Sequence, residues 1–204
     1  TRRNLELTET LREKQKRGSL LWVLDKTRTA MGARMLRSFL EQPLIHKNEM
    51  EERLDAVEAF CSNPVARDEI REYLNPIYDL ERLLGKVSYK TANPRDMIAF
   101  RSSMEMLPHI KTVLKELPGT ANEKIEQEMD GLEDLYLLIC DSIEEEPPIT
   151  IREGGMIKAG YNEDIDNLRR AKTEGKNWLA ELENAERERT GIKNLRVKYN
   201  KVFG

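Results

Sequence analysis

The chain has 204 residues, of which 39% are hydrophobic, 35% charged and 6% aromatic, and its formal net charge is −3. That length can bury a sizeable core in one large or two small domains, and the abundant charge is typical of helices with solvent-exposed faces. The slightly acidic balance excludes a protein that coats nucleic acid over its whole surface. No signal peptide or long apolar run is present, so we expect a protein that neither crosses a membrane nor is secreted.

Hydrophobic periodicity and turn residues predict an all-α fold, with a multi-helix core, one long protruding helix and minor short β-strands. The common apolar residues are Leu, Met and Ala, which favour helix over strand. The predicted helices span residues 8–17, 30–41, 48–61, 64–74, 76–87, 94–117, 122–143 and 162–190.

Particular residues mark where several of these helices begin or break. An Asn that caps a helix, followed by a proline in the first turn, predicts three helix starts, at Asn63-Pro64, Asn75-Pro76 and Asn93-Pro94. Asn48 and Glu51 have the spacing of a capping box. Pro108 predicts a kink or a break at Leu107.

Two stretches have the pattern of strands rather than helices. Residues 149–158 predict two short strands around a turn at Gly154 and Gly155. Residues 195–200 alternate apolar and polar side chains, which predicts a half-buried strand.

The long helix predicted at 162–190 changes character along its length. Its apolar positions are Ile165, Leu168, Ala171, Trp178, Leu179 and Leu182, and no large apolar residue follows within the helix. Beyond that point we expect it to stand in water, supported by pairs such as Glu183 with Arg187. About 29 residues at about 1.5 Å each span roughly 43 Å, so we interpret this helix as an arm.

Charge is distributed unevenly toward the end of the chain. Residues 187–204 carry a local charge of +5, and residues 121–146 carry −9. On the predicted terminal strand, Arg196, Lys198 and Asn200 share one face. This face is either a solvated edge whose Lys discourages aggregation, or a surface that contacts DNA phosphates through Arg196, Lys198 and Lys201.

Motifs of common catalytic and metal sites are missing from the sequence. It has no phosphate-binding P-loop, no Cys-x-x-Cys and no His-Glu-x-x-His motif, so we expect no catalytic residue, cofactor or metal in this chain. Cys61 and Cys140 lie among apolar neighbours, which predicts buried free thiols rather than a disulfide.

Several segments stand in a recognisable order along the chain: 1–7 (TRRNLEL), 18–36 (GSLLWVLDKTRTAMGARML), 79–83 (DLERL), 92–96 (ANPRD), 154–162 (GGMIKAGYN), 186–192 (ERERTGI) and 195–204 (LRVKYNKVFG). Together they closely resemble the start of the core domain of the MutS family of bacterial DNA mismatch-recognition proteins. The resemblance implies a helical core at residues 1–161, a lever helix at 162–190 and the first strand of a clamp domain at 191–204.

The resemblance also implies what the longer parent protein does. It would bind mismatched double-stranded DNA, form a homodimer through an ABC-type ATPase domain that uses ATP and Mg, and work with MutL in the bacterial cytoplasm, at the nucleoid. The family's mismatch-wedging Phe and its Walker motifs have no counterparts here, so the chain itself would not be an enzyme. It starts with Thr1 rather than Met, which also favours a part of a longer polypeptide.

Two other classes of function remain as alternatives. One is a self-contained helical scaffold that binds partner proteins. The other is a hydrolase that uses the acidic stretches, which would need convergent carboxylates with perturbed pKa values.

Overall fold

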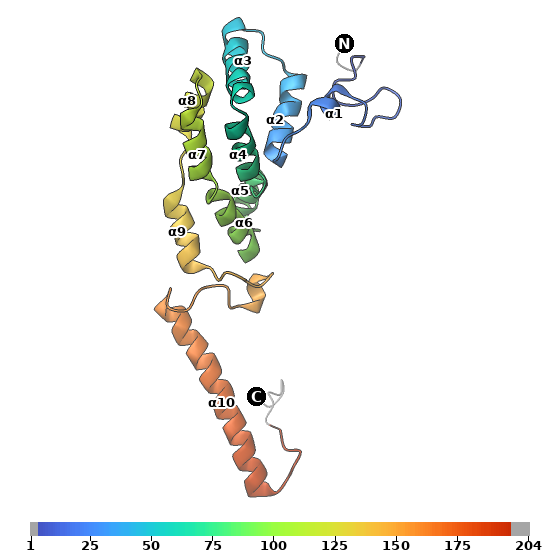
Figure 1. The fold of residues 1–204 in the computed structure, drawn as a ribbon. Helices are drawn as coiled ribbons and strands as arrows, with labels where there is room; N and C mark the ends of the chain where they lie inside the picture. The colour runs from blue at the N-terminus through green and yellow to red at the C-terminus, as the bar shows by residue number, and fades with distance from the viewer. Residues whose placement is uncertain (1–3, 197–204) are drawn as a thin grey trace. The chain divides into compact units, whose positions relative to one another are not determined.

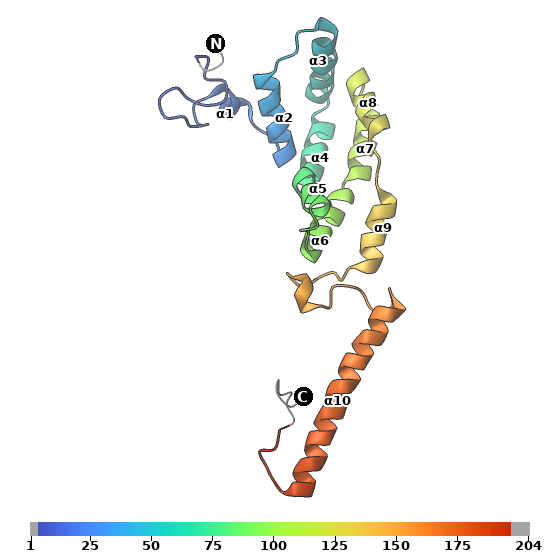
Figure 2. The same cartoon turned by 180° about the vertical axis from the view of Figure 1, so that it is seen from behind.

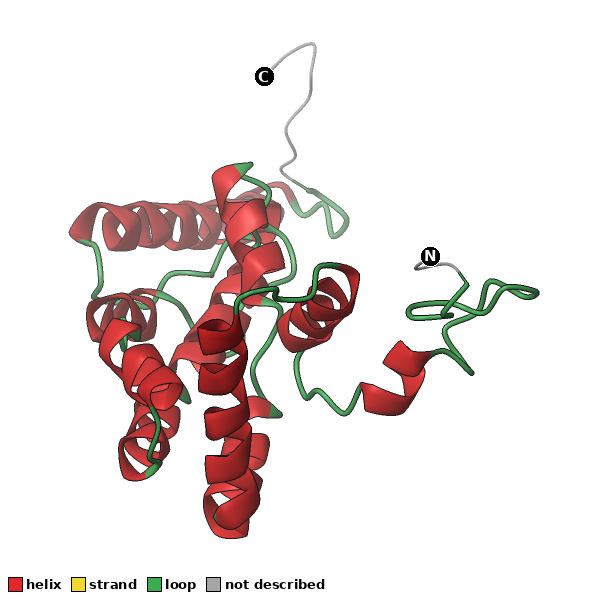
Figure 3. Cartoon of the chain, turned by 90° about the horizontal axis from the view of Figure 1, so that it is seen from above, coloured by secondary structure: helices red, strands yellow, loops and turns green. Residues whose placement is uncertain are grey.

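The computed structural model describes residues 4–196. The regular secondary-structure elements in that range are all helices (Figures 1 and 3). The all-α fold class is confirmed. The chain divides into two units, residues 1–156 and 157–204, whereas the division at residues 161 and 190 stays a prediction. The first unit contains α1 (Leu20–Leu24), α2 (Ala30–Glu41), α3 (Lys47–Ser62), α4 (Pro64–Leu74), α5 (Leu80–Ser88), α6 (Pro94–Met104), α7 (Leu107–Glu116), α8 (Thr120–Glu128), α9 (Glu133–Ser142) and the 3₁₀ helix η1 (Ile151–Glu153). The second unit contains α10 (Glu163–Thr190).

The core of the first unit lies where α3 and α4 pack against α7 and α8, which stand side by side in two opposite views (Figures 1 and 2). Its buried residues are Ala59, Ala66, Ile70, Ile110, Val113, Leu114 and Leu117. The members on α7 and its C-cap recur every three or four residues, so they form one apolar face. The two alanines leave room for these larger side chains.

A second contact region surrounds α6, which packs against α5 and α9 (Figure 2). Met104 is only 1% exposed and Ser103 is fully buried. The Ser103 hydroxyl accepts a hydrogen bond from the Tyr78 N–H (3.0 Å) and donates one to the Ala99 carbonyl (2.8 Å). This polar side chain therefore ties the loop before α5 to α6 and has its hydrogen-bonding capacity satisfied.

Two of the three predicted Asn-Pro helix starts are confirmed. The Asn63 side chain caps α4, and Asn93 forms a capping box with Asp96 at the start of α6. The capping box predicted at Asn48 is wrong, because α3 begins one residue earlier with His46 as its N-cap. Asn48 thus lies inside the first helical turn, where its side chain cannot act as the cap.

The third start, at Asn75-Pro76, is wrong. Asn75 keeps helical backbone angles at the end of α4, and α5 begins only at Leu80. The N-cap of α5 is Asp79, whose carboxylate accepts a hydrogen bond from the Arg82 N–H (3.2 Å). Arg34 of α2 also binds this carboxylate through two hydrogen bonds of 2.7 and 2.8 Å. This contact between distant segments favours Asp79 as the N-cap.

Proline and left-handed backbone angles decide where two long predicted helices divide. The break expected at Leu107 is confirmed, because α7 begins there with Pro108 in its first turn. The single helix predicted at 122–143 is wrong, since α8 and α9 are separate. Leu132 has a φ of 51°, and its N–H donates to the Asp130 carboxylate (3.0 Å), so a local side-chain contact replaces the helical hydrogen bond.

The helix predicted at 8–17 is also wrong, because this region forms turns. Lys14 and the nearby Glu6 have φ values of 50° and 47°, which an α-helix cannot accommodate. The Glu6 carboxylate accepts a hydrogen bond from the Leu11 N–H at 2.7 Å. The helix of this region is α1, which starts after Ser19, whose hydroxyl accepts from the Trp22 N–H (3.3 Å).

The β-hairpin predicted at residues 149–158 is wrong as well. All ten residues are described, and the regular element among them is η1. The Glu153 carboxylate accepts hydrogen bonds from the Thr150 N–H (3.0 Å) and hydroxyl (2.8 Å), which closes a tight turn. A capping box thus forms where the sequence pattern predicts the first strand.

Neither cysteine is in a disulfide, but the expected burial is wrong for Cys61, which is exposed, while Cys140 is half-buried. In the part of the chain that the structure describes, no helix is both long and apolar enough to pass through a lipid bilayer.

Candidate nucleic-acid interface

The long helix α10 has residues at both ends that favour its start and its termination. The Asn162 side chain accepts a hydrogen bond from the Ile165 N–H (3.1 Å) and caps the first turn, where three acidic residues lie. Arg187 and Arg189 lie in the last turn, and Gly191 ends the helix with a φ of 69°. Acids at the N-terminus and bases at the C-terminus both stabilise the helix dipole. The 28 residues of α10 give a length of about 42 Å, which confirms the predicted long helix.

No residue of α10 is buried. Three of the apolar side chains in its first two thirds are exposed, namely Leu168 (72%), Trp178 (61%) and Leu179 (44%). That the helix leaves the core after Leu182 stays a prediction.

The exit segment, residues 191–196, follows α10 and leads toward the predicted DNA-contacting residues. Together with the last turn of the helix it contains four basic residues and one acidic residue, Glu188, so its net charge is +3. The basic residues are Arg187, Arg189, Lys193 and Arg196. Arg196 is exposed, whereas Lys198 and Lys201 lie outside the described residues, as does most of the predicted strand at 195–200. The three residues as a DNA-contacting set stay a prediction. A concentrated positive charge of this kind can attract phosphates.

The sequence pattern predicted one contact of Arg187 and missed another. Its ion pair with Glu183, one helical turn earlier, is confirmed. The Arg187 Nε–H also donates a 2.9 Å hydrogen bond to the carbonyl of Leu195 in the exit segment. The signal that could have found this contact is Gly191, a residue that permits the left-handed turn by which the chain folds back after the helix.

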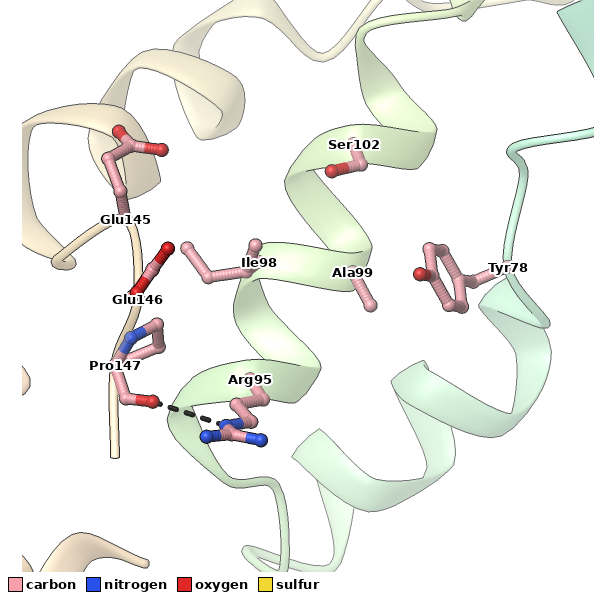
Figure 4. A pocket seen from close by; sticks show the side chains of 8 residues that line it. All are labelled: Tyr78, Arg95, Ile98, Ala99, Ser102, Glu145, Glu146 and Pro147. Carbon is pink, nitrogen blue, oxygen red and sulfur yellow. Dashed lines mark hydrogen bonds between the residues drawn. The ribbon is translucent and has the colours of Figure 1, made fainter. Parts of the chain in front are cut away.

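A cavity of about 350 Å³ lies in the first unit, between α6 and the residues after α9 (Figure 4). It is lined by Tyr78, Arg95, Ile98, Ala99, Ser102, Glu145, Glu146 and Pro147. Arg95 donates to the Pro147 carbonyl (3.2 Å), and Glu145 accepts two hydrogen bonds from Arg101 (2.6 and 2.9 Å), which raises the pKa of that guanidinium. The lining residues, all described, include no histidine, cysteine or lysine.

Two carboxylic acids of the first unit, Asp25 and Asp79, have a lowered pKa. Hydrogen bonds from Lys16 and Thr27 lower the pKa of Asp25 to about 2, and Arg34 lowers that of Asp79 to about 2. A general acid at neutral pH needs the opposite shift. No cluster of three or more potential metal ligands from His, Cys, Asp and Glu occurs in the described range.

Comparison with known proteins identifies the family of this chain. The family model of MutS domain III matches residues 1–202. The chain belongs to the MutS domain III family. It is 67% identical over 204 residues to a DNA mismatch repair protein MutS of Lachnoclostridium phytofermentans, covering all of this chain and 22% of that protein. Proteins of the same name from Clostridium novyi (53%, 22% of its length) and Acetivibrio thermocellus (52%, 23%) also match over the whole chain.

The segments that resemble the MutS family coincide with particular structural features of this chain. Segment 79–83 forms the N-cap and first turn of α5, and segment 92–96 includes the capping box of α6. Segment 154–162 leads from η1 to the N-cap of α10, and segment 186–192 covers the last turn of α10 and its C-cap. The chain spans about a fifth of the length of these relatives, so it represents one region of a longer type of protein.

Proposed function

We propose that this chain is the core and lever region of a protein that recognises DNA mismatches, in which α10 mechanically couples a DNA-holding clamp to a distant ATPase domain. The observation that carries the proposal is α10 itself: about 42 Å of helix without a buried residue, ending in a basic exit segment. A rigid helix can transmit a displacement over its length, and a basic end can contact phosphates without reading sequence.

The activities of the whole protein are part of the same proposal. It binds mismatched double-stranded DNA in the cytoplasm, at the nucleoid. It forms a homodimer through an ATPase domain outside these 204 residues, where ATP and Mg bind, and it acts together with MutL. The matched relatives, which are DNA mismatch repair proteins, support this proposal.

A self-contained scaffold for partner proteins is the competing interpretation. The two interpretations differ in what the gene encodes. We expect an open reading frame several times longer than 204 codons, with a phosphate-binding P-loop downstream. A gene that ends with this chain would favour the scaffold.

The DNA part of the proposal can be tested on the chain itself by fluorescence anisotropy, with matched and mismatched duplexes at several salt concentrations. We expect weak binding that does not distinguish the duplexes. With about three phosphate contacts, from Arg196, Lys198 and Lys201, the slope of log K against log salt should be roughly −2.7, at about −0.9 per contact.

Two results would contradict the proposal that this chain contacts DNA phosphates without recognising the mismatch. A slope near zero would mean that the basic residues make no phosphate contacts. A mismatch preference above about tenfold, equivalent to about 1.4 kcal/mol, would place mismatch recognition within this chain. Replacing the three basic residues with Ala provides the control, since the salt dependence should then largely disappear.

A further inference from the structure

Arg187, in the last turn of α10, has partners on all three nitrogen atoms of its guanidinium group. One terminal nitrogen forms the ion pair with Glu183, and the other donates to the Asn184 side-chain oxygen (3.4 Å). The third, Nε, donates to the Leu195 carbonyl (2.9 Å). The first two partners lie on α10 and the third lies eight residues further along the chain, so Arg187 joins the helix to the exit segment.

The exit segment is folded so that this hydrogen bond can form. The Gly191 N–H donates to the Arg187 carbonyl (2.9 Å), and the Leu195 N–H donates to the Ile192 carbonyl (3.2 Å). The Leu195 carbonyl belongs to the peptide bond that leads directly into Arg196. Holding that carbonyl therefore restricts the backbone from which the exposed Arg196 side chain projects.

Arg189 makes an instructive comparison because it lies two residues further along the same helical turn. Its hydrogen bonds, of 2.8 to 3.2 Å, all go to Glu186, and its side chain is 73% exposed, against 34% for Arg187. The two arginines therefore contribute equal charge near the exit segment. Of the two, Arg187 is the one whose described contacts reach across the turn to Leu195.

We infer that Arg187 is a positioning residue: it fixes the Leu195–Arg196 peptide against α10 and so orients Arg196 toward a DNA phosphate. This role rests on the proposed DNA-binding function. A tethered segment loses less conformational entropy on binding than a free one, so the tether strengthens binding without a direct contact to DNA. The role needs the arginine side chain, because a lysine has no planar fork with separate donors for Glu183 and Leu195.

The test compares duplex binding of three variants of the chain with that of the wild type. Arg187→Met and Arg189→Met each remove one positive charge and keep helix propensity. Arg189→Met should weaken binding by about two- to threefold through lost long-range attraction, which added salt reduces. Arg187→Met should weaken binding by at least about fivefold more, and Arg187→Lys should fail to restore it although the charge is kept.

A double-mutant cycle with Arg196→Ala tests whether the effect acts through Arg196. In that background, the additional loss caused by Arg187→Met should vanish. The inference is overturned if Arg187→Met and Arg189→Met agree within about twofold, or if the loss is the same with and without Arg196.

Hydrogen exchange separates failure of the tether from failure of the proposed function. Arg187→Met should speed exchange of the Leu195 N–H, and Arg189→Met should leave it unchanged. If the wild-type chain binds no duplex, the proposed function fails, and the positioning role for DNA fails with it. If it binds duplex but exchange at Leu195 is equally slow in both variants, the tether is absent and only the inference about Arg187 fails.

Discussion

Replacing Asp96 with Ala should destabilise the first unit more than removal of a surface carboxylate would. Asp96 is at the start of α6, and its side chain is only 12% exposed. One carboxylate oxygen accepts a hydrogen bond from the Asn93 N–H (2.9 Å), which completes the capping box. The other oxygen accepts from the Lys86 ammonium group at the end of α5 (2.7 Å). The substitution therefore removes a helix cap and a link between two helices together.

The magnitude follows from these two contacts. A hydrogen bond to a charged group contributes about 1.5–3 kcal/mol, and the partly exposed pair with Lys86 adds up to about 1 kcal/mol. Because the two contributions share one carboxylate and are not additive, we expect the free energy of unfolding to fall by about 2–3 kcal/mol. For a chain of this length, that loss lowers the melting temperature by about 4–12 °C.

The pH dependence gives a second check with a defined sign. Burial raises the pKa of Asp96, but hydrogen bonds from Lys86 and the Asn93 N–H outweigh it, so the pKa lies below its usual value. A lowered pKa in the folded state means stabilisation that is present above the unfolded pKa of about 3.9 and lost as the pH falls through the folded value. The difference between wild type and Asp96→Ala should therefore be largest near neutral pH and shrink below about pH 4.

Urea denaturation followed by circular dichroism at several pH values measures this difference. Asp141→Ala, which removes an exposed carboxylate on α9, is the matched control and should change stability by less than about 0.5 kcal/mol. The reasoning is refuted if Asp96→Ala costs no more than the control, or if its cost is the same at pH 3 as at pH 7.

Three further outcomes are expected. Leu114→Ala, in the core on α7, should cost about 2–5 kcal/mol in urea denaturation, whereas Leu138→Ala, at a position 51% exposed, should cost less than about 1 kcal/mol; equal costs would contradict the assigned core. Arg34→Met should lower stability slightly at neutral pH, an effect that fades as the pH falls from about 4 toward 2 and Asp79 becomes protonated; a pH-independent cost would count against this pair. Calorimetry with ATP should detect no saturable binding to this chain, and a measurable isotherm would reveal a nucleotide site without a P-loop.

Features that depend on neighbouring residues could be predicted from the amino-acid sequence. The ends of α2 and α4 coincide with the predicted 30–41 and 64–74, and α10 begins one residue from its predicted start. The break at Leu107 and the end of α10 before Gly191 follow from proline and glycine backbone geometry, which acts within a few residues. The all-α class and the resemblance of the whole chain to the MutS family likewise follow from the residues and their order.

Only the folded chain decides which polar groups pair with one another where several could do so. Asp79 rather than Asn75 caps α5, in a network where Arg34, 45 residues earlier, binds its carboxylate. Side-chain hydrogen bonds at Glu153 and Asp130 replaced a predicted hairpin and divided a predicted helix. Periodicity cannot anticipate such outcomes, because it records which face of an element is apolar and not which polar groups will meet. Gly191 signals the turn after α10, but the folded chain decides that this turn brings the Leu195 carbonyl to Arg187.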